Sequence, residues 1–154
     1  MVVAGDGDLR SALEERARGM GDRVRFVGAL DRDLVARALA AADVVAVPSI
    51  VDNAGNVDGL PNTVLEALAS GRAVVASRVA GIPEVVEDGV NGLLVPAGDT
   101  HALAAALTRL ARDPAAREQL GREARAQAVA RLGWDAVARR FEESYAQAAA
   151  LDAR

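Results

Sequence analysis

Two acidic residues, Asp58 and Glu66, are the side chains of this sequence best suited by type and spacing to do chemistry. Seven residues separate them in the stretch Pro48–Gly71, PSIVDNAGNVDGLPNTVLEALASG. Glu66 belongs to a mainly apolar segment, NTVLEALA, in which an unpaired buried charge would be costly. We therefore expect Glu66 either to bind a ligand or to lie at the solvent edge of the fold.

The residues around Glu66 predict a helix that opens at Pro61 and stops at Gly71. Proline suits the first helical position, and glycine suits the left-handed residue just past a helix end. The free N–H groups at the start of such a helix, together with its positive dipole, favour phosphate. Glu66 follows Asn62 by four positions, so the two side chains share one helix face. The stretch therefore predicts an anion-binding turn followed by a carboxylate.

The rest of the chain alternates apolar strands with amphipathic helices. Strands are expected at residues 2–4, 24–27, 43–47, 73–76 and 93–95, the third of them buried. This alternation indicates an α/β fold, a Rossmann-like parallel sheet with helices on both faces. Ligands of such sheets bind beyond the carboxyl ends of the strands. Four turns fall at those ends and are expected to converge on one crevice: Gly5–Gly7, Gly28, Pro48–Pro61 and Ala80–Pro83.

Two further features complete the predicted architecture. Gly5 and Gly7 follow the first strand and are candidates for substrate binding, although Gly-x-Gly often only makes a tight turn. From Asp99 onward the pattern is helical, with a tail over about residues 134–150. Asp31, Asp99 and Asp113 stand at predicted helix starts. The arginines of this helical part are expected to form a solvated face: 112, 117, 122, 125 and 131.

Composition excludes several classes of function. The chain has 154 residues and a net charge of −4, with no basic stripe interleaved with aromatic residues, so nucleic acid is not an expected partner. It has no cysteine, and its single histidine, His101, cannot form a His-pair metal site. No apolar run approaches the roughly 20 residues of a membrane helix, and no signal peptide is evident. We expect a cytoplasmic protein without a metal or another cofactor.

A series of short motifs runs along the chain in a fixed order: Pro48-Ser49, Asp58-Gly59-Leu60-Pro61-Asn62, Glu66-Ala67-Leu68-Ala69, Gly71-Arg72-Ala73-Val74-Val75, Gly81-Ile82-Pro83-Glu84, Asp88-Gly89-Val90-Asn91-Gly92-Leu93-Leu94-Val95 and Trp134…Tyr145. Each motif is weak alone, but their order and spacing are specific. Together they resemble the donor domain of the retaining GT-B glycosyltransferases of the large group-1, glycogen-synthase-like family. The resemblance spans nearly the whole chain.

The resemblance implies roles for the candidate residues. Members of this family hold a nucleotide-diphosphate sugar in the C-terminal of two Rossmann-like domains. By position, Glu66 would hydrogen-bond the ribose, and Asp58 would contact the sugar hydroxyls and the reacting centre. The diphosphate or sugar would be held by backbone N–H groups of Gly59, Leu60, Asn62 and Thr63. Family members retain the anomeric configuration and generally need no metal.

The sequence departs from the family pattern in three respects. Asp58 stands where the family usually has Glu, and Ala80 stands where it has the first glycine of Gly-Gly-x-Pro-Glu. The opening strand and helix that carry an Arg and a Lys for the diphosphate are absent, as is the N-terminal acceptor domain. We therefore expect residues 1–154 to be a single donor-binding domain, truncated at its start and inactive alone.

Other interpretations stay open at this point. A nucleotide-sugar epimerase would share the fold, and a glycoside hydrolase would use Asp58 and Glu66 as its carboxylate pair, about 5 Å apart in the retaining case. A non-catalytic assembly domain would form a homodimer that occludes the crevice. The sequence names neither the base, the sugar nor the acceptor. A peripheral association of the full-length enzyme with the inner face of the membrane is equally open.

Overall fold

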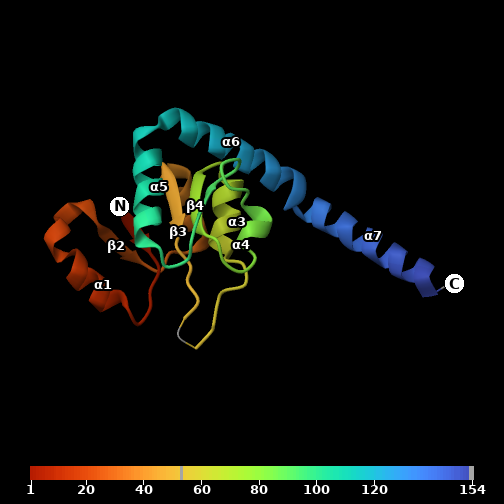
Figure 1. The fold of residues 1–154 in the computed structure, drawn as a ribbon, viewed down its shortest axis with the longest axis horizontal. Coiled ribbons are helices and arrows are strands. Elements are labelled where there is room, and N and C mark those ends of the chain that lie inside the picture. Colours follow the sequence, from red (N-terminus) through yellow and green to blue (C-terminus); the bar gives the residue numbers. More distant parts are fainter. Residues whose placement is uncertain (53, 153–154) are drawn as a thin grey trace. The chain divides into compact units, whose positions relative to one another are not determined.

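The computed structural model describes residues 1–52 and 54–152, and these form two compact units, Met1–Ala38 and Leu39–Arg154. Every strand pair in both units is parallel, and helices join the strands. Figure 1 shows the order of these elements along the chain. The α/β fold with parallel strands and a helical tail is therefore confirmed. Organisation as one domain stays a prediction.

The first unit holds a two-stranded sheet of β1 (Val2–Ala4) and β2 (Arg25–Gly28). Helix α1 (Arg10–Ala17) and the 3-10 helix η1 (Arg18–Arg23) connect the strands. The predicted second strand thus begins one residue later than expected and includes Gly28. The Gly5 N–H donates to the Gly28 carbonyl over 2.8 Å, which joins the two glycine turns at the carboxyl ends of the strands.

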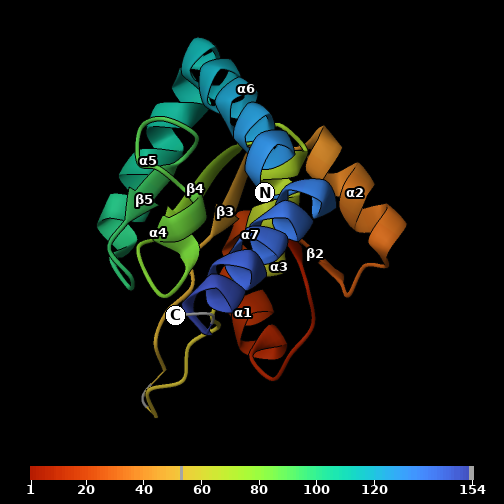
Figure 2. The ribbon, with the colours of Figure 1, turned by 90° about the vertical axis from the view of Figure 1, so that its right-hand side faces the viewer.

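The second unit is built on a three-stranded sheet in the order β3-β4-β5. Its strands are Val44–Val47, Ala73–Ser77 and Leu93–Val95. Helix α2 (Arg32–Ala41) precedes β3, and the boundary between the two units falls within it. The other helices, drawn in Figures 1 and 2, are α3 (Asn62–Ala69), α4 (Ile82–Val85), α5 (Thr100–Arg112), α6 (Pro114–Arg131) and α7 (Trp134–Asp152). Among the described residues, no helix is both long enough and apolar enough to cross a membrane.

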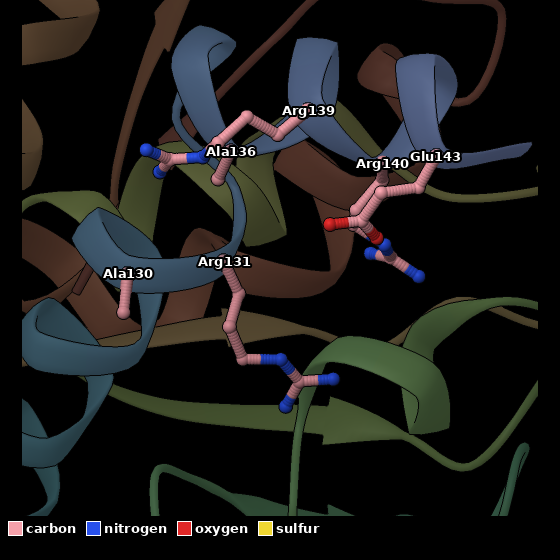
Figure 3. Close-up of a pocket in the computed structure, with 6 residues that line it drawn as sticks. All are labelled: Ala130, Arg131, Ala136, Arg139, Arg140 and Glu143. Atoms are coloured by element: carbon pink, nitrogen blue, oxygen red, sulfur yellow. The ribbon is translucent and has the colours of Figure 1, made fainter. Parts of the chain in front are cut away.

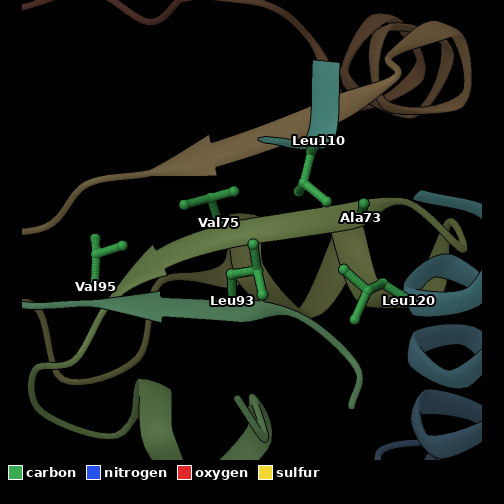
Figure 4. Close-up of a cluster of buried hydrophobic side chains, with 6 residues drawn as sticks. All are labelled: Ala73, Val75, Leu93, Val95, Leu110 and Leu120. Atoms are coloured by element: carbon green, nitrogen blue, oxygen red, sulfur yellow. The ribbon is translucent and has the colours of Figure 1, made fainter. Parts of the chain in front are cut away.

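Strand β4 is the centre of the core because it has a partner strand on each side. All its residues are buried, and side chains of α5 and α6 pack over Ala73 and Val75 (Figure 4). Val74 and Ala76 point to the opposite face and are equally buried, so both faces of the strand are covered. Strand β3 was expected to be buried. It is an edge strand of this sheet, and of its four residues only Val45 is buried.

The predicted helix starts are largely confirmed. Asp31, Asp99 and Asp113 accept backbone N–H groups at their helix starts over 2.8, 2.8 and 2.9 Å. Pro61 differs slightly from its prediction: its extended ψ of 127° places it just before α3, which begins at Asn62. Gly71 has a φ of 67° beyond the end of α3, as expected of a left-handed glycine. His101 is exposed, as expected.

Candidate functional site

The connection from β3 to α3 carries most of the predicted site residues. Asp58, Gly59 and Leu60 form the turn that leads into α3, and Asn62 and Thr63 open the helix. The side chains of Asp58 and Glu66 are both exposed. Because Glu66 is exposed, its charge carries no burial cost. Glu66 lies at the solvent edge, where a ligand can also reach it. Both carboxylates are thus accessible to solvent, and so are the two residues that open the helix, Asn62 and Thr63.

A polar turn organises the middle of this loop. One Asp52 carboxylate oxygen accepts the backbone N–H groups of Ala54 and Asn56, each over 2.8 Å, and the other accepts the Asn56 amide over 2.9 Å. The Asn56 side-chain bond, followed by the backbone bonds, lowers the pKa of Asp52. Sequence reasoning did not single out Asp52. The signal for it was an Asp with Asn and Gly within four residues, which is typical of a turn.

The loops that follow β3 and β4 meet at two glycines. The Gly81 N–H donates to the Gly59 carbonyl over 2.7 Å. A Cβ atom on Gly81 would lie 2.9 Å from that same oxygen, so only glycine permits this approach. The convergence predicted for Pro48–Pro61 and Ala80–Pro83 is therefore confirmed. The convergence of these loops with the turns at Gly5 and Gly28 stays a prediction.

Ala80 has a φ of 48°, the left-handed conformation that glycine adopts without strain. The departure from the Gly-Gly-x-Pro-Glu pattern therefore leaves a strained residue beside the Gly59–Gly81 contact. Left-handed backbone costs a non-glycine residue about 1–2 kcal/mol. Strain of this kind persists only where the surrounding structure fixes it. Here Arg78 N–H donates to Val95 O over 2.7 Å, and Gly81 is held by Gly59.

Replacing Ala80 by glycine is expected to raise the free energy of unfolding by about 0.5–1 kcal/mol, because the relief of strain exceeds the added entropy of the unfolded chain. The midpoint of urea unfolding measures this change. The matched control is Ala97→Gly, since Ala97 is exposed and does not have a positive φ. The control should lose stability slightly. An equal loss in both variants would contradict strain at Ala80.

Two hollows of the second unit lie away from the candidate site. One of about 400 Å³ lies between α6 and α7, and Figure 3 shows Arg131, Arg139, Arg140 and Glu143 around it. The other, of about 650 Å³, lies where β4 begins. Asp58 and Glu66 line neither of them. Among the described residues, no three His, Cys, Asp or Glu side chains gather as a metal site, and the metal-free prediction is untested.

Comparison with known proteins assigns a family to these motifs. A family model described as glycosyl transferases group 1 matches residues 1–113. Phosphatidyl-myo-inositol mannosyltransferase from Mycobacterium leprae is 38% identical over 145 residues, which cover 94% of this chain and 37% of that protein. The chain spans 37% of the length of that relative and 28% of the amylovoran biosynthesis glycosyltransferase AmsK of Erwinia amylovora, to which it is 40% identical over 116 residues.

Solved structures share the fold. The HepE protein of Anabaena, solved in complex with UDP, is 25% identical with a TM-score of 0.80, and the match covers 95% of this chain and 40% of that one. The C-terminal domain of a glycosyl transferase group 1 family protein from Francisella tularensis is 25% identical with a TM-score of 0.72. That match covers 82% of this chain and 64% of that one.

Proposed function

Because the chain belongs to the glycosyl transferases of group 1, we propose that it binds the nucleotide-diphosphate sugar in an enzyme that transfers this sugar to an acceptor. The observation that carries the proposal is the turn into α3. There, an exposed carboxylate and a glycine directly precede the first N–H groups of a helix, and a second exposed carboxylate follows one turn further on. The relatives named above are transferases, so the epimerase and hydrolase alternatives find no support.

The residues of the turn have distinct roles in this proposal. Departure of the sugar leaves negative charge on the diphosphate, and the first N–H groups of α3 stabilise that charge. Glu66 accepts hydrogen bonds from the ribose hydroxyls. Asp58 reaches the sugar hydroxyls through a shifted loop or a water molecule, because its side chain is one methylene shorter than Glu. Protein groups neutralise the charge without a metal, and the transfer retains the anomeric configuration.

The complete enzyme needs more polypeptide than this chain contains. The Mycobacterium leprae relative is matched over only 37% of its length, which supports a further acceptor-binding half. The isolated chain is therefore inactive in transfer and binds the donor weakly. Its proposed location is the cytoplasm, and the full-length enzyme works at the inner face of the membrane if its acceptor is a lipid. The homodimer of the assembly interpretation stays a prediction.

Calorimetric titration with a panel of nucleoside diphosphates and their sugars tests the proposal. We expect the chain to select one base, and Glu66→Ala to weaken that binding at least tenfold because the ribose loses its acceptor. The matched control is Glu123→Ala, which removes an exposed glutamate from α6. The panel is repeated on a longer form that includes the preceding half. If neither form binds any nucleotide, the proposal is wrong.

A further inference from the structure

The groove of about 650 Å³ in the second unit lies where strand β4 begins, at the end of the sheet opposite to the candidate donor site. Gly71, Arg72 and Ala73 line it where β4 begins, whereas the Asp58 turn follows the carboxyl end of the parallel strand β3. The other wall is α6 from Pro114 to Ala126. Its charged lining consists of four arginines and two carboxylates: Arg72, Arg117, Arg122, Arg125, Asp43 and Glu118.

The floor of this groove is a backbone contact between two glycines. A Cβ atom on Gly121 of α6 would lie 2.3 Å from the Gly71 carbonyl oxygen. The missing side chain therefore lets α6 rest directly on the turn that precedes β4. Gly121 is buried, and its neighbour Leu120 packs into the core around Ala73 (Figure 4). The arginines thus project from elements that are fixed against each other, as a binding site requires.

Two of the arginines are anchored through one nitrogen each. Arg117 Nη1 donates to Leu110 O over 2.6 Å and to Ala111 O over 3.2 Å, at the end of α5. Arg125 Nη1 donates to Ala69 O, at the end of α3. These bonds offset the negative ends of both helices. A guanidinium has five N–H donors, so each anchored group keeps further donors in a fixed orientation.

The carboxylates of the groove hold these cations only loosely. Arg117 Nη2 lies 3.8 Å from Asp43 Oδ1, and Arg122 Nη1 lies 3.7 Å from Glu118 Oε2, both too long for hydrogen bonds. The Asp43 and Glu118 side chains are 86% and 74% exposed, so their ion pairs contribute little. The lining therefore carries four permanent positive charges against two weakly paired negative ones.

Arg72 adds an unsatisfied donor. Its Nε is buried, and it has no hydrogen-bond partner among the residues that the structure describes. Buried polar groups are almost always paired, so this donor is left uncompensated within the described residues, beside the charged lining of the groove. The prediction that the α6 arginines form only a solvated face is wrong for Arg117, whose side chain is 20% exposed and bound to the end of α5.

From these observations we propose that the groove binds a phosphate oxyanion of a phosphorylated ligand. The planar fork of arginine donors matches phosphate oxygens, and a groove of this size accommodates a small molecule or a headgroup. The ligand is a soluble phosphate ester or the headgroup of an anionic lipid, which share this chemistry. The site is independent of the donor site, so it does not rest on the proposed function.

Titration of the complete chain with inorganic phosphate at low salt, followed by amide NMR shifts, tests the site. We expect saturable shifts around Arg72 and Gly121 that Glu66→Ala leaves unchanged. Arg122→Glu reverses a charge on a side chain that is 71% exposed, so it should keep the fold and weaken binding at least tenfold. Arg72→Gln should weaken binding similarly. The control Arg37→Gln with Arg109→Gln, two exposed arginines outside the groove, should change binding less than twofold.

A second arm identifies the source of the phosphate. The chain is sedimented with phosphatidylcholine vesicles that contain or lack phosphatidylglycerol. Binding that needs phosphatidylglycerol and is lost in Arg122→Glu assigns the groove to a lipid headgroup. Phosphate-induced shifts without vesicle binding assign it to a soluble ester. The proposal is overturned if neither arm shows saturable binding, or if Arg122→Glu binds as well as the control.

Discussion

Replacing Gly121 by alanine is expected to lower the free energy of unfolding by about 3 kcal/mol, although alanine is the better helix former by about 1 kcal/mol. The new Cβ would lie 2.3 Å from the Gly71 carbonyl oxygen and 3.1 Å from its carbon. Both neighbours are backbone atoms, so no side chain can rotate away to make room. Helix α6 would have to move off β4, which opens the core around Leu120.

Urea unfolding followed by circular dichroism measures this loss. Gly19→Ala is the matched control, because a Cβ there meets nothing within 4 Å and the φ of Gly19 is not positive. The control should leave the unfolding midpoint unchanged or raise it slightly. If Gly121→Ala were as stable as the control, α6 would not rest on the Gly71 turn, and the floor of the arginine groove would be lost with it.

Asn91→Ala is expected to destabilise the fold by about 3 kcal/mol. The Asn91 side chain is 1% exposed and makes three hydrogen bonds. Its oxygen accepts the Glu87 N–H over 2.7 Å, and its nitrogen donates to Val85 O over 2.9 Å and to Gln127 Oε1 over 2.8 Å. Alanine would leave these partners partly buried and unsatisfied, at about 1 kcal/mol or more each.

A double-mutant cycle with Gln127 isolates the long-range part of this network. Gln127→Ala alone removes one of the three bonds and should cost only about 1 kcal/mol. The double variant should be less destabilised than the sum of the single variants, because the two residues share a bond. Equal losses in the two single variants would mean that the bonds to Glu87 and Val85 contribute nothing to stability.

The elements of this fold could be predicted because their signals are local. The apolar run from Ala73 to Ala76 defined the central strand, and the structure extends it by a single residue, Ser77. Asp99 and Asp113 marked helix starts because a capping carboxylate reaches an N–H only three residues away. The place of the candidate site could also be predicted from the strand order, because parallel strands bring their carboxyl ends to the same end of the sheet.

Other features were hidden because their partners are distant in sequence. The dipeptide Asn91-Gly92 is by itself typical of a tight turn. The turn exists, but its left-handed residue is Gly89, and the Asn91 side chain is buried against Gln127, 36 residues away. No local pattern indicates the contact of Gly121 with Gly71, because the two residues are distant in sequence. The anchoring of Arg117 was invisible for the same reason.

The α/β alternation and the segment that carries Asp58 and Glu66 followed from the sequence alone, because periodicity and helix capping act over a few residues. The family followed from the order of short motifs along the chain. Which backbone segments touch was set by the packing of the folded chain: Gly59 contacts Gly81, and Gly71 lies against Gly121. Such contacts arise when elements far apart in the chain pack to within van der Waals distance. No local sequence pattern encodes these close approaches, which require glycine at positions 81 and 121. The same packing of α6 against the start of β4 brings the four arginines to one groove.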